Sequence, residues 1–377
     1  MIRKLFQFRR ASLLIFIGLA LLLSWWYWQS LGVSDVPQIL YLGWDEAGVI
    51  QLFRTDMTGT AVTPLTDAAS GIANFALSPD GSRIAYRTIA PDGGEAGSEI
   101  WVMDGNGRRP QLLLACAEFT CLNPTWAADN ERLIYERRLL PADGGLPDAP
   151  HIWWLDADGG ETYPVLVDDH AIGSGASLSP DGQWVSFFAP ETGSMELYNF
   201  VDGRHFLVQN QVGSAAVWHP TQPLFLMNDL GLVDWPVSAD EHAEGEHRHT
   251  NLGIHLFVVD TETEARTQLS ETAIVDDATP AWSPDGQWIA FGRRPARTDV
   301  GRQLWLMRAD GSEAHALTDA LTIHFGPPAW SQNGRFLLYQ RYDTTMPDAQ
   351  PSIWLLEIAT GQQTEVVSAG FLPVWLP

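Results

Sequence analysis

The string Ser-Pro-Asp-Gly recurs along this chain, and it constrains the fold more than any other feature of the sequence. Complete copies, each preceded by Leu or Trp, lie at 77–81, 178–182 and 282–286, and degraded copies begin at Trp126, Trp218 and Trp330. Ser suits the first position of a tight turn, Pro fixes φ at the second, and Gly accepts a left-handed backbone at the end. A strand-forming segment such as Ile289-Ala290-Phe291 follows each complete copy. The string therefore predicts a turn between two strands, repeated along the chain.

A second motif, an aliphatic residue followed by an aromatic one, recurs in step with the first. It occurs seven times, about 50 residues apart, at Leu52-Phe53, Ile100-Trp101, Ile152-Trp153, Leu197-Tyr198, Leu256-Phe257, Leu304-Trp305 and Ile353-Trp354. A Gly-containing turn follows six of these copies. Each repeat thus predicts four strands with a hairpin at either end, which is one blade of a β-propeller.

Pro precedes several of the repeat Trp residues by two positions, at Pro124, Pro280, Pro328 and Pro373. Because Pro has no N–H to donate, it is confined to edge strands. The innermost strand of a blade is such an edge, so these positions favour the same architecture.

The two ends of the repeat region complement each other. Residues 39–44 resemble the second strand of a blade that lacks its first, and residues 371–377 resemble a first strand that lacks its second. Pairing the two would close a ring and remove exposed sheet edges. We therefore expect an all-β, seven-bladed β-propeller over residues 39–377. Six or eight blades are the alternatives if a degraded copy is misread.

A basic and then apolar segment precedes the repeats. Residues 1–10 carry four Lys or Arg, and residues 11–28 are almost entirely apolar. As a helix, the apolar run would be about 27 Å long, close to the thickness of a bilayer core. Since basic flanks stay cytoplasmic, we expect a single-pass transmembrane signal-anchor helix, a linker at 29–38 and an extracytoplasmic propeller at the cell membrane. The alternative is a signal peptide that is cleaved to give a secreted protein.

The charge and composition exclude several classes of function. The net charge is −24, which argues against binding nucleic acid or anionic lipid. Lys4 is the only lysine, so the folded region has neither a Schiff-base lysine nor a P-loop lysine. It also lacks the Gly-x-Ser-x-Gly string of a serine hydrolase.

The two cysteines, Cys116 and Cys121, are close in sequence. In an oxidising compartment they could form a small disulfide loop, and two free thiols are the alternative.

One long connection, at 229–252, is rich in His and carboxylates. His242, His247 and His249 stand among acidic residues and are candidate ligands for a divalent metal ion, the one cofactor that the sequence suggests. Their spacing matches no metalloprotease helix motif, and a solvated acidic loop is the alternative.

The strings at 281–291 (A-W-S-P-D-G-Q-W-I-A-F) and 304–318 resemble the TolB-type subgroup of WD40-like repeats. The resemblance covers nearly everything from residue 39 onward. It implies a β-propeller, and it implies an envelope protein that binds other proteins. Similar repeats also form the propellers of some peptidases and of a few sugar-active enzymes. The chain departs from the TolB pattern because an expected anchor takes the place of an α/β domain before the propeller.

Three hypotheses on function follow. The first is a non-enzymatic envelope scaffold or sensor that binds a protein partner through the long connections, because function concentrates on loops carried by rigid scaffolds. The second is a propeller that binds a glycan or another small ligand, given its supply of Trp and Tyr. The third is a metal-dependent enzyme such as a lyase, which would need His170, His255 and His324 to converge. The sequence does not determine the oligomeric state.

Overall fold

The computed structural model describes residues 37–93, 96–141, 148–166, 170–233, 251–270, 274–346 and 348–376. The expected anchor at 11–28, its flank and most of its linker lie outside these residues, as do His242, His247 and His249. None of the described segments forms a helix that is long and apolar enough to cross a membrane. Their regular structure consists entirely of β-strands, so the all-β prediction is confirmed.

Four sheets have four strands each. In spatial order, the first contains β29 (Phe371–Leu376), β1 (Gln38–Trp44), β2 (Ile50–Asp56) and β3 (Thr63–Pro64). The second contains β4 (Ile72–Leu77), β5 (Arg83–Thr88), β6 (Ser98–Asp104) and β7 (Gln111–Cys116). The third contains β8 (Phe119–Trp126), β9 (Arg132–Leu139), β10 (His151–Asp156) and β11 (Thr162–Pro164). The fourth contains β12 (Ser174–Leu178), β13 (Trp184–Ala189), β14 (Ser194–Asn199) and β15 (His205–Gln209).

Two larger sheets complete the described region. An eight-stranded sheet contains β16 (Val217–Trp218), β17 (Leu224–Val233), β18 (Asn251–Asp260) and β19 (Arg266–Gln268), followed by β20 (Val275–Trp282), β21 (Trp288–Pro295), β22 (Gln303–Arg308) and β23 (His315–Ala316). A single parallel pair, Ile254 with Asp276, links these two sets of strands. The sixth sheet contains β24 (Ile323–Phe325), β25 (Ala329–Trp330), β26 (Phe336–Asp343), β27 (Ser352–Glu357) and β28 (Gln363–Val367).

The Ser-Pro-Asp-Gly strings form the turns between the first two strands of a sheet. In the copy before β5, the Ser78 hydroxyl donates to Asp80 Oδ1 at 2.7 Å and accepts the Arg83 N–H at 2.9 Å. Gly81 adopts a φ of +71°, which a side chain would disfavour. Hydrogen bonds from Ser82 and Ser78 hold the pKa of Asp80 below its usual value. The Ser and Asp of the motif therefore act in the turn itself.

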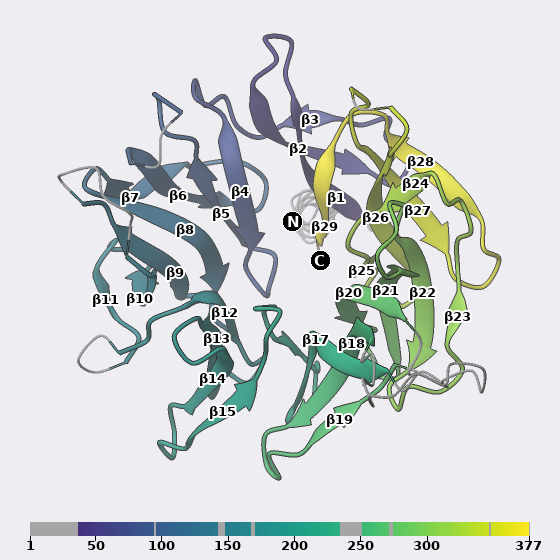
Figure 1. The fold of residues 1–377 in the computed structure, drawn as a ribbon. Helices are drawn as coiled ribbons and strands as arrows, with labels where there is room; N and C mark the ends of the chain where they lie inside the picture. The colour runs from purple at the N-terminus through teal and green to yellow at the C-terminus, as the bar shows by residue number, and fades with distance from the viewer. Residues whose placement is uncertain are drawn as a thin grey trace, which may run out of the picture. The chain divides into compact units, whose positions relative to one another are not determined.

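Strand β29 pairs with β1, although the two come from opposite ends of the described chain (Figure 1). The antiparallel register places Gln38 opposite Leu376 and Ile39 opposite Trp375. Within residues 38–376 the sheets follow one another in chain order around a ring, and this pairing completes the first sheet (Figure 1).

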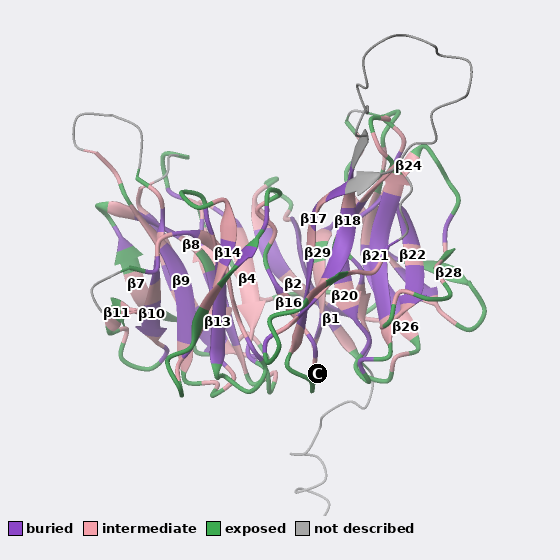
Figure 2. Ribbon diagram, turned by 60° about the horizontal axis from the view of Figure 1, so that its bottom comes forward, coloured by how far each residue is buried: buried purple, intermediate pink, exposed green. Residues whose placement is uncertain are grey.

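Apolar side chains between successive sheets form the core, and the buried parts of the strands lie inside the unit (Figure 2). The described residues form seven clusters, represented by the pairs Leu42 and Ile84, Ile100 and Tyr135, Ile134 and Phe187, Leu197 and Phe225, Leu256 and Phe291, Leu304 and Tyr339, and Leu338 and Ile39. Each cluster joins neighbouring strand sets, so stability depends on packing between them.

Repeat Trp residues add a polar link at four of these junctions. Each indole N–H donates to a backbone carbonyl of the preceding strand set: Trp126 to Ala76, Trp282 to Val217, Trp330 to Ala281 and Trp375 to Ala329, at 3.0–3.1 Å. The Trp of the repeat is thus a structural residue.

The antiparallel order gives the unit two faces. The turns after the first and third strands of a sheet lie on one, the short-turn face. The connections between the second and third strands, and those from one sheet to the next, lie on the other, the long-loop face.

Candidate functional site

The two cysteines are joined. Cys116 ends β7 and Cys121 lies in β8, their Cα atoms are 6.1 Å apart, and both side chains are buried. The disulfide therefore connects the outer strand of the second sheet to the inner strand of the third.

The three histidines named for a metal-dependent enzyme lie in different parts of the ring. His170 is exposed between β11 and β12, His255 lies in β18 and His324 lies in β24. Among the described residues, no group of three or more His, Cys, Asp or Glu side chains could hold a metal ion. The structure thus does not bring the three together as a metal site.

His255 has a structural role that the repeat explains. Its ring is fully buried, and Nδ1 lies 3.3 Å from the Ser270 hydroxyl. In other sheets the same position carries Gln51 or Gln303, which accept a hydroxyl hydrogen bond from Thr66 or Thr318. His255 therefore holds the connection that follows its own strand set.

A cluster of ionisable side chains lies on the long-loop face, where β20, β21, β24, β26 and the residue before β22 come together. We call it the arginine cluster, and it consists of Asp276, Arg294, Arg302, His324 and Tyr342. Arg294 Nε lies 3.6 Å from Asp276 Oδ2, and both side chains are partly buried.

Asp277, which follows Asp276 in β20, and Arg293, which precedes Arg294 in β21, form an ion pair next to the cluster. Arg293 Nε and Nη2 donate to the two carboxylate oxygens of Asp277 at 2.6 and 2.8 Å. The Asp277 side chain is fully buried and that of Arg293 is 9 % exposed. This bidentate ion pair is complete, so it leaves no charge of its own for a ligand.

Arg302 is the unusual member. It is half-buried, its guanidinium makes no hydrogen bond or ion pair with any residue that the structure describes, and its Nε atom is inaccessible to solvent. Gly292 makes room for it, because a Cβ at that position would lie 2.6 Å from Arg302 Cδ. Burial and the neighbouring charge of Arg294 lower the pKa of Arg302. A half-buried cation without a partner is a ready site for an anion.

His324 and Tyr342 form the wall beside Arg302. Their rings stack with centroids 4.9 Å apart and planes inclined by 24°. Burial, followed by the charges of Arg302 and Arg294, lowers the pKa of His324, so the imidazole is neutral at pH 7. Three arginines against two aspartates leave this region cationic in a chain of net charge −24.

Of this cluster the sequence pointed only to His324, and Arg294, Arg302 and Tyr342 were missed. A signal for Arg294 and Tyr342 was present in the second strand of three repeats. Two residues after its aromatic, an Arg stacks on the Trp of the aliphatic-aromatic pair in the next strand: Arg137 on Trp153, Arg293 on Trp305 and Arg341 on Trp354, with the guanidinium carbon 3.9–4.7 Å from the ring centroid. These arginines are structural. The following position holds Arg138, Arg294 or Tyr342, and it is the one that varies in chemistry.

The comparisons with known proteins bear on the fold. No protein-family model matches the chain, and no curated protein matches it in sequence. Among solved structures, the chain is similar to the β-propeller domain of the Trilobed protease from Pyrococcus furiosus, with 12% identity, coverage of 88% of this chain and 91% of that one, and a TM-score of 0.58. The fold is a β-propeller.

Two further structures show how widely this propeller occurs. TolB from Acinetobacter baumannii is 14% identical, with coverage of 92% of this chain and 69% of that one and a TM-score of 0.51. A puromycin-hydrolyzing peptidase from Mycobacterium tuberculosis is 13% identical, with coverage of 88% of this chain and 53% of that one and a TM-score of 0.62. The similarity to TolB expected from the repeats is confirmed at the level of the fold.

Proposed function

We propose that this propeller is a non-enzymatic envelope protein that binds a protein partner through the arginine cluster on its long-loop face. The observation that carries the proposal is the half-buried guanidinium of Arg302, which has no partner among the described residues. The resemblance to TolB-type repeats points to the same class of function. The basic and apolar N-terminal segment supports a tether that holds the propeller outside the cytoplasm.

The chemistry of the surface identifies the kind of partner. Arg302 and Arg294 offer N–H donors to a carboxylate, and Tyr342 beside them is 38% exposed. Leu372 lies in β29 of the adjacent sheet and is 42% exposed. Its N–H donates to Oε1 of Gln340, which lies in the same strand as Tyr342, at 2.8 Å. Arg and aromatic side chains next to apolar ones are typical of the centre of a protein interface. We infer a partner segment that carries an acidic residue or a C-terminal carboxylate beside an apolar side chain.

We also propose that the propeller has seven blades. Dividing the eight-stranded sheet at its one parallel pair gives two four-stranded sets, and the other sheets supply five more. The seven apolar clusters of the described residues match seven junctions around the ring.

The experiment measures binding of a labelled peptide with an acidic and apolar C-terminus to the purified full chain. Arg302→Gln should weaken binding by about tenfold or more, because hydrogen bonds to charged groups contribute about 1.5–3 kcal/mol. Arg108→Gln removes the same charge from an exposed turn on the short-turn face, and it should leave the affinity unchanged. Equal effects of the two substitutions would show that only net charge matters, and the proposed site would be wrong.

A further inference from the structure

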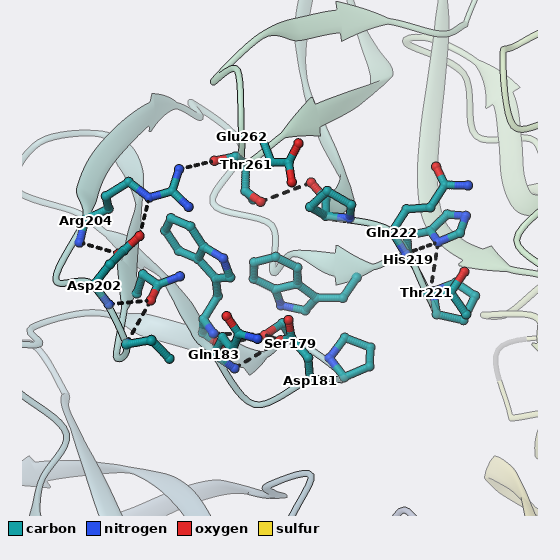
Figure 3. A pocket seen from close by; sticks show the side chains of 17 residues that line it. Ser179, Asp181, Gln183, Asp202, Arg204, His219, Thr221, Gln222, Thr261 and Glu262 are labelled. Carbon is teal, nitrogen blue, oxygen red and sulfur yellow. Dashed lines mark hydrogen bonds and ion pairs between the residues drawn. The ribbon is translucent and has the colours of Figure 1, made fainter.

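A cavity of about 360 Å³ lies on the short-turn face, opposite to the arginine cluster. It is formed between the fourth sheet and the strand set β16–β19, from the turns that follow β12, β14, β16 and β18. Figure 3 shows Gln183, Arg204, Gln222 and Glu262 around it. The arginine cluster contributes no residue to this cavity.

This junction differs from its neighbours because one Trp link is missing. The indole Nε1 of Trp218 is buried and has no hydrogen-bond partner, whereas four other repeat Trp residues donate to a carbonyl of the preceding strand set. The carbonyl at the equivalent place is that of Ser177, and it accepts the Ser186 hydroxyl at 3.3 Å instead.

The cross-strand partner of this carbonyl explains the difference. At the four linked junctions the residue opposite the accepting carbonyl is apolar: Ala85, Leu226, Ala290 or Leu338. At this junction it is Ser186, which has a hydroxyl to donate. The Ser186 hydroxyl therefore competes with the Trp218 indole for the Ser177 carbonyl, and the cavity lies beside this unlinked Trp.

The lining combines two indole rings, of Trp184 and Trp218, with polar side chains. Arg204 is already neutralised, because it donates to Asp202 at 2.8 Å, and its guanidinium carbon lies 5.0 Å from the centroid of Trp184. The carboxylates of Asp181 and Glu262 make no ion pair with a described residue. Asp181 Oδ1 accepts the Ser179 hydroxyl and the Gln183 N–H within its turn, which leaves Oδ2 for a ligand. The cavity thus carries a net negative charge, which disfavours an anionic ligand.

We propose that this cavity binds a short neutral saccharide. A sugar ring offers C–H groups to the indoles, and its hydroxyls can donate to Asp181 and Glu262 and exchange hydrogen bonds with Gln183 and Gln222. A volume of about 360 Å³ lies at the lower end of the range for ligand pockets, which selects a small ligand. A cationic ligand fits less well, since Arg204 already occupies the place of a cation beside Trp184.

The test titrates the purified full chain with a panel of neutral monosaccharides and disaccharides, followed by calorimetry and by intrinsic Trp fluorescence. At least one should bind with a dissociation constant below about 10 mM. Glu262→Gln should weaken that binding by about fivefold or more, because an amide replaces one charged acceptor. The matched control, Glu313→Gln, changes an exposed turn carboxylate near Arg308 and should bind as the unchanged protein does.

Two results would overturn the proposal. The first is that no neutral saccharide binds; if tetramethylammonium binds in that case, the cavity is assigned to cations. The second is that Glu262→Gln binds the saccharide as tightly as the unchanged chain does. Saccharide binding should persist in Arg302→Gln, so failure of this proposal and failure of the arginine cluster can be told apart.

Discussion

Arg302 lies across Gly292 on the long-loop face, so that a methyl group at position 292 would come within 2.6 Å of Arg302 Cδ. Gly292 does not adopt a positive φ, so Ala suits its backbone and would act through the Arg302 side chain. We expect Gly292→Ala to displace the guanidinium and weaken acidic-peptide binding by about tenfold. Combining Gly292→Ala with Arg302→Gln should give no loss beyond that of Arg302→Gln alone. Additive losses would mean that Gly292 acts elsewhere.

The ion pair of Asp277 and Arg293 should be needed for stability. Asp277→Asn leaves a buried guanidinium without its charge partner, and we expect the free energy of unfolding to fall by about 3–5 kcal/mol. Asp276→Asn makes the same chemical change in a partly exposed pair, and it should cost about 0–1 kcal/mol. Chemical denaturation of the two variants measures the difference. Similar losses would contradict the distinction between the two pairs.

The propeller should lose stability in mild acid through His219. Its Nδ1 accepts the N–H groups of Thr221 and Gln222 at 3.1 and 2.9 Å, which requires a neutral ring, and burial lowers its pKa. The unfolded chain takes up a proton near pH 6.5 whereas the folded ring resists it. This stability is therefore present above about pH 6.5 and is lost as the pH falls below it.

His219→Ser is the test, because Ser occupies the same turn position in the complete repeats. The variant should keep the turn and show a smaller fall in melting temperature between about pH 7 and 5. Part of the fall should persist, since burial also lowers the pKa of His255 and His324. An unchanged pH profile would remove His219 from the explanation.

Ser186→Ala should create the missing Trp link between the fourth sheet and the strand set β16–β19. Without the competing hydroxyl, the Ser177 carbonyl becomes free to accept the Trp218 indole N–H. We expect the free energy of unfolding to rise by about 1 kcal/mol, while saccharide binding weakens as the junction closes. The control is Ser194→Ala on the neighbouring β14. A motif serine such as Ser78 is unsuitable as a control because its hydroxyl holds a turn. Destabilisation by Ser186→Ala would show that its hydroxyl is the better donor.

The disulfide between Cys116 and Cys121 should contribute measurable stability even though it closes a short loop. A loop of this size constrains the unfolded chain by about 2 kcal/mol. Cys116→Ser and Cys121→Ser should therefore lose similar amounts, and reductant should lower the melting temperature of the unchanged chain alone. A further effect of reductant on either variant would contradict this account.

Most of the fold could be predicted from the repeated sequence motifs. Ser78, Asp80 and Gly81 form a turn from their own hydrogen bonds and backbone preferences, so the turn can be predicted locally. The position of the repeat Trp can be read from the motif, but its hydrogen-bond partner lies about 50 residues away. Trp126, for example, donates to the Ala76 carbonyl in the preceding sheet. The all-β architecture and the similarity to TolB were predictable for this reason. The N-terminal anchor and the site at His242, His247 and His249 stay predictions.

The candidate sites could not be predicted in the same way. Arg302 becomes half-buried only because a Gly at 292 makes room on the adjacent strand and because β24 brings His324 beside it. The unlinked Trp218 beside the cavity reflects one hydroxyl, that of Ser186, which donates to a carbonyl whose counterparts at four other junctions accept a Trp indole N–H. Both features arise from contacts between strands, and neither follows a motif.

Because β1 pairs with β29, the first strand of the propeller stays uncovered until the last strand has been synthesised. Until β29 emerges, the hydrogen-bonding edge of β1 and the apolar surface around Ile39 have no cover. A chain that stops short of Phe371 would therefore present an open strand edge, the feature that promotes aggregation and recognition by proteases. Only a ring in which β29 pairs with β1 hides that edge, so proteases that recognise open strand edges would act on chains that lack β29 and not on closed rings.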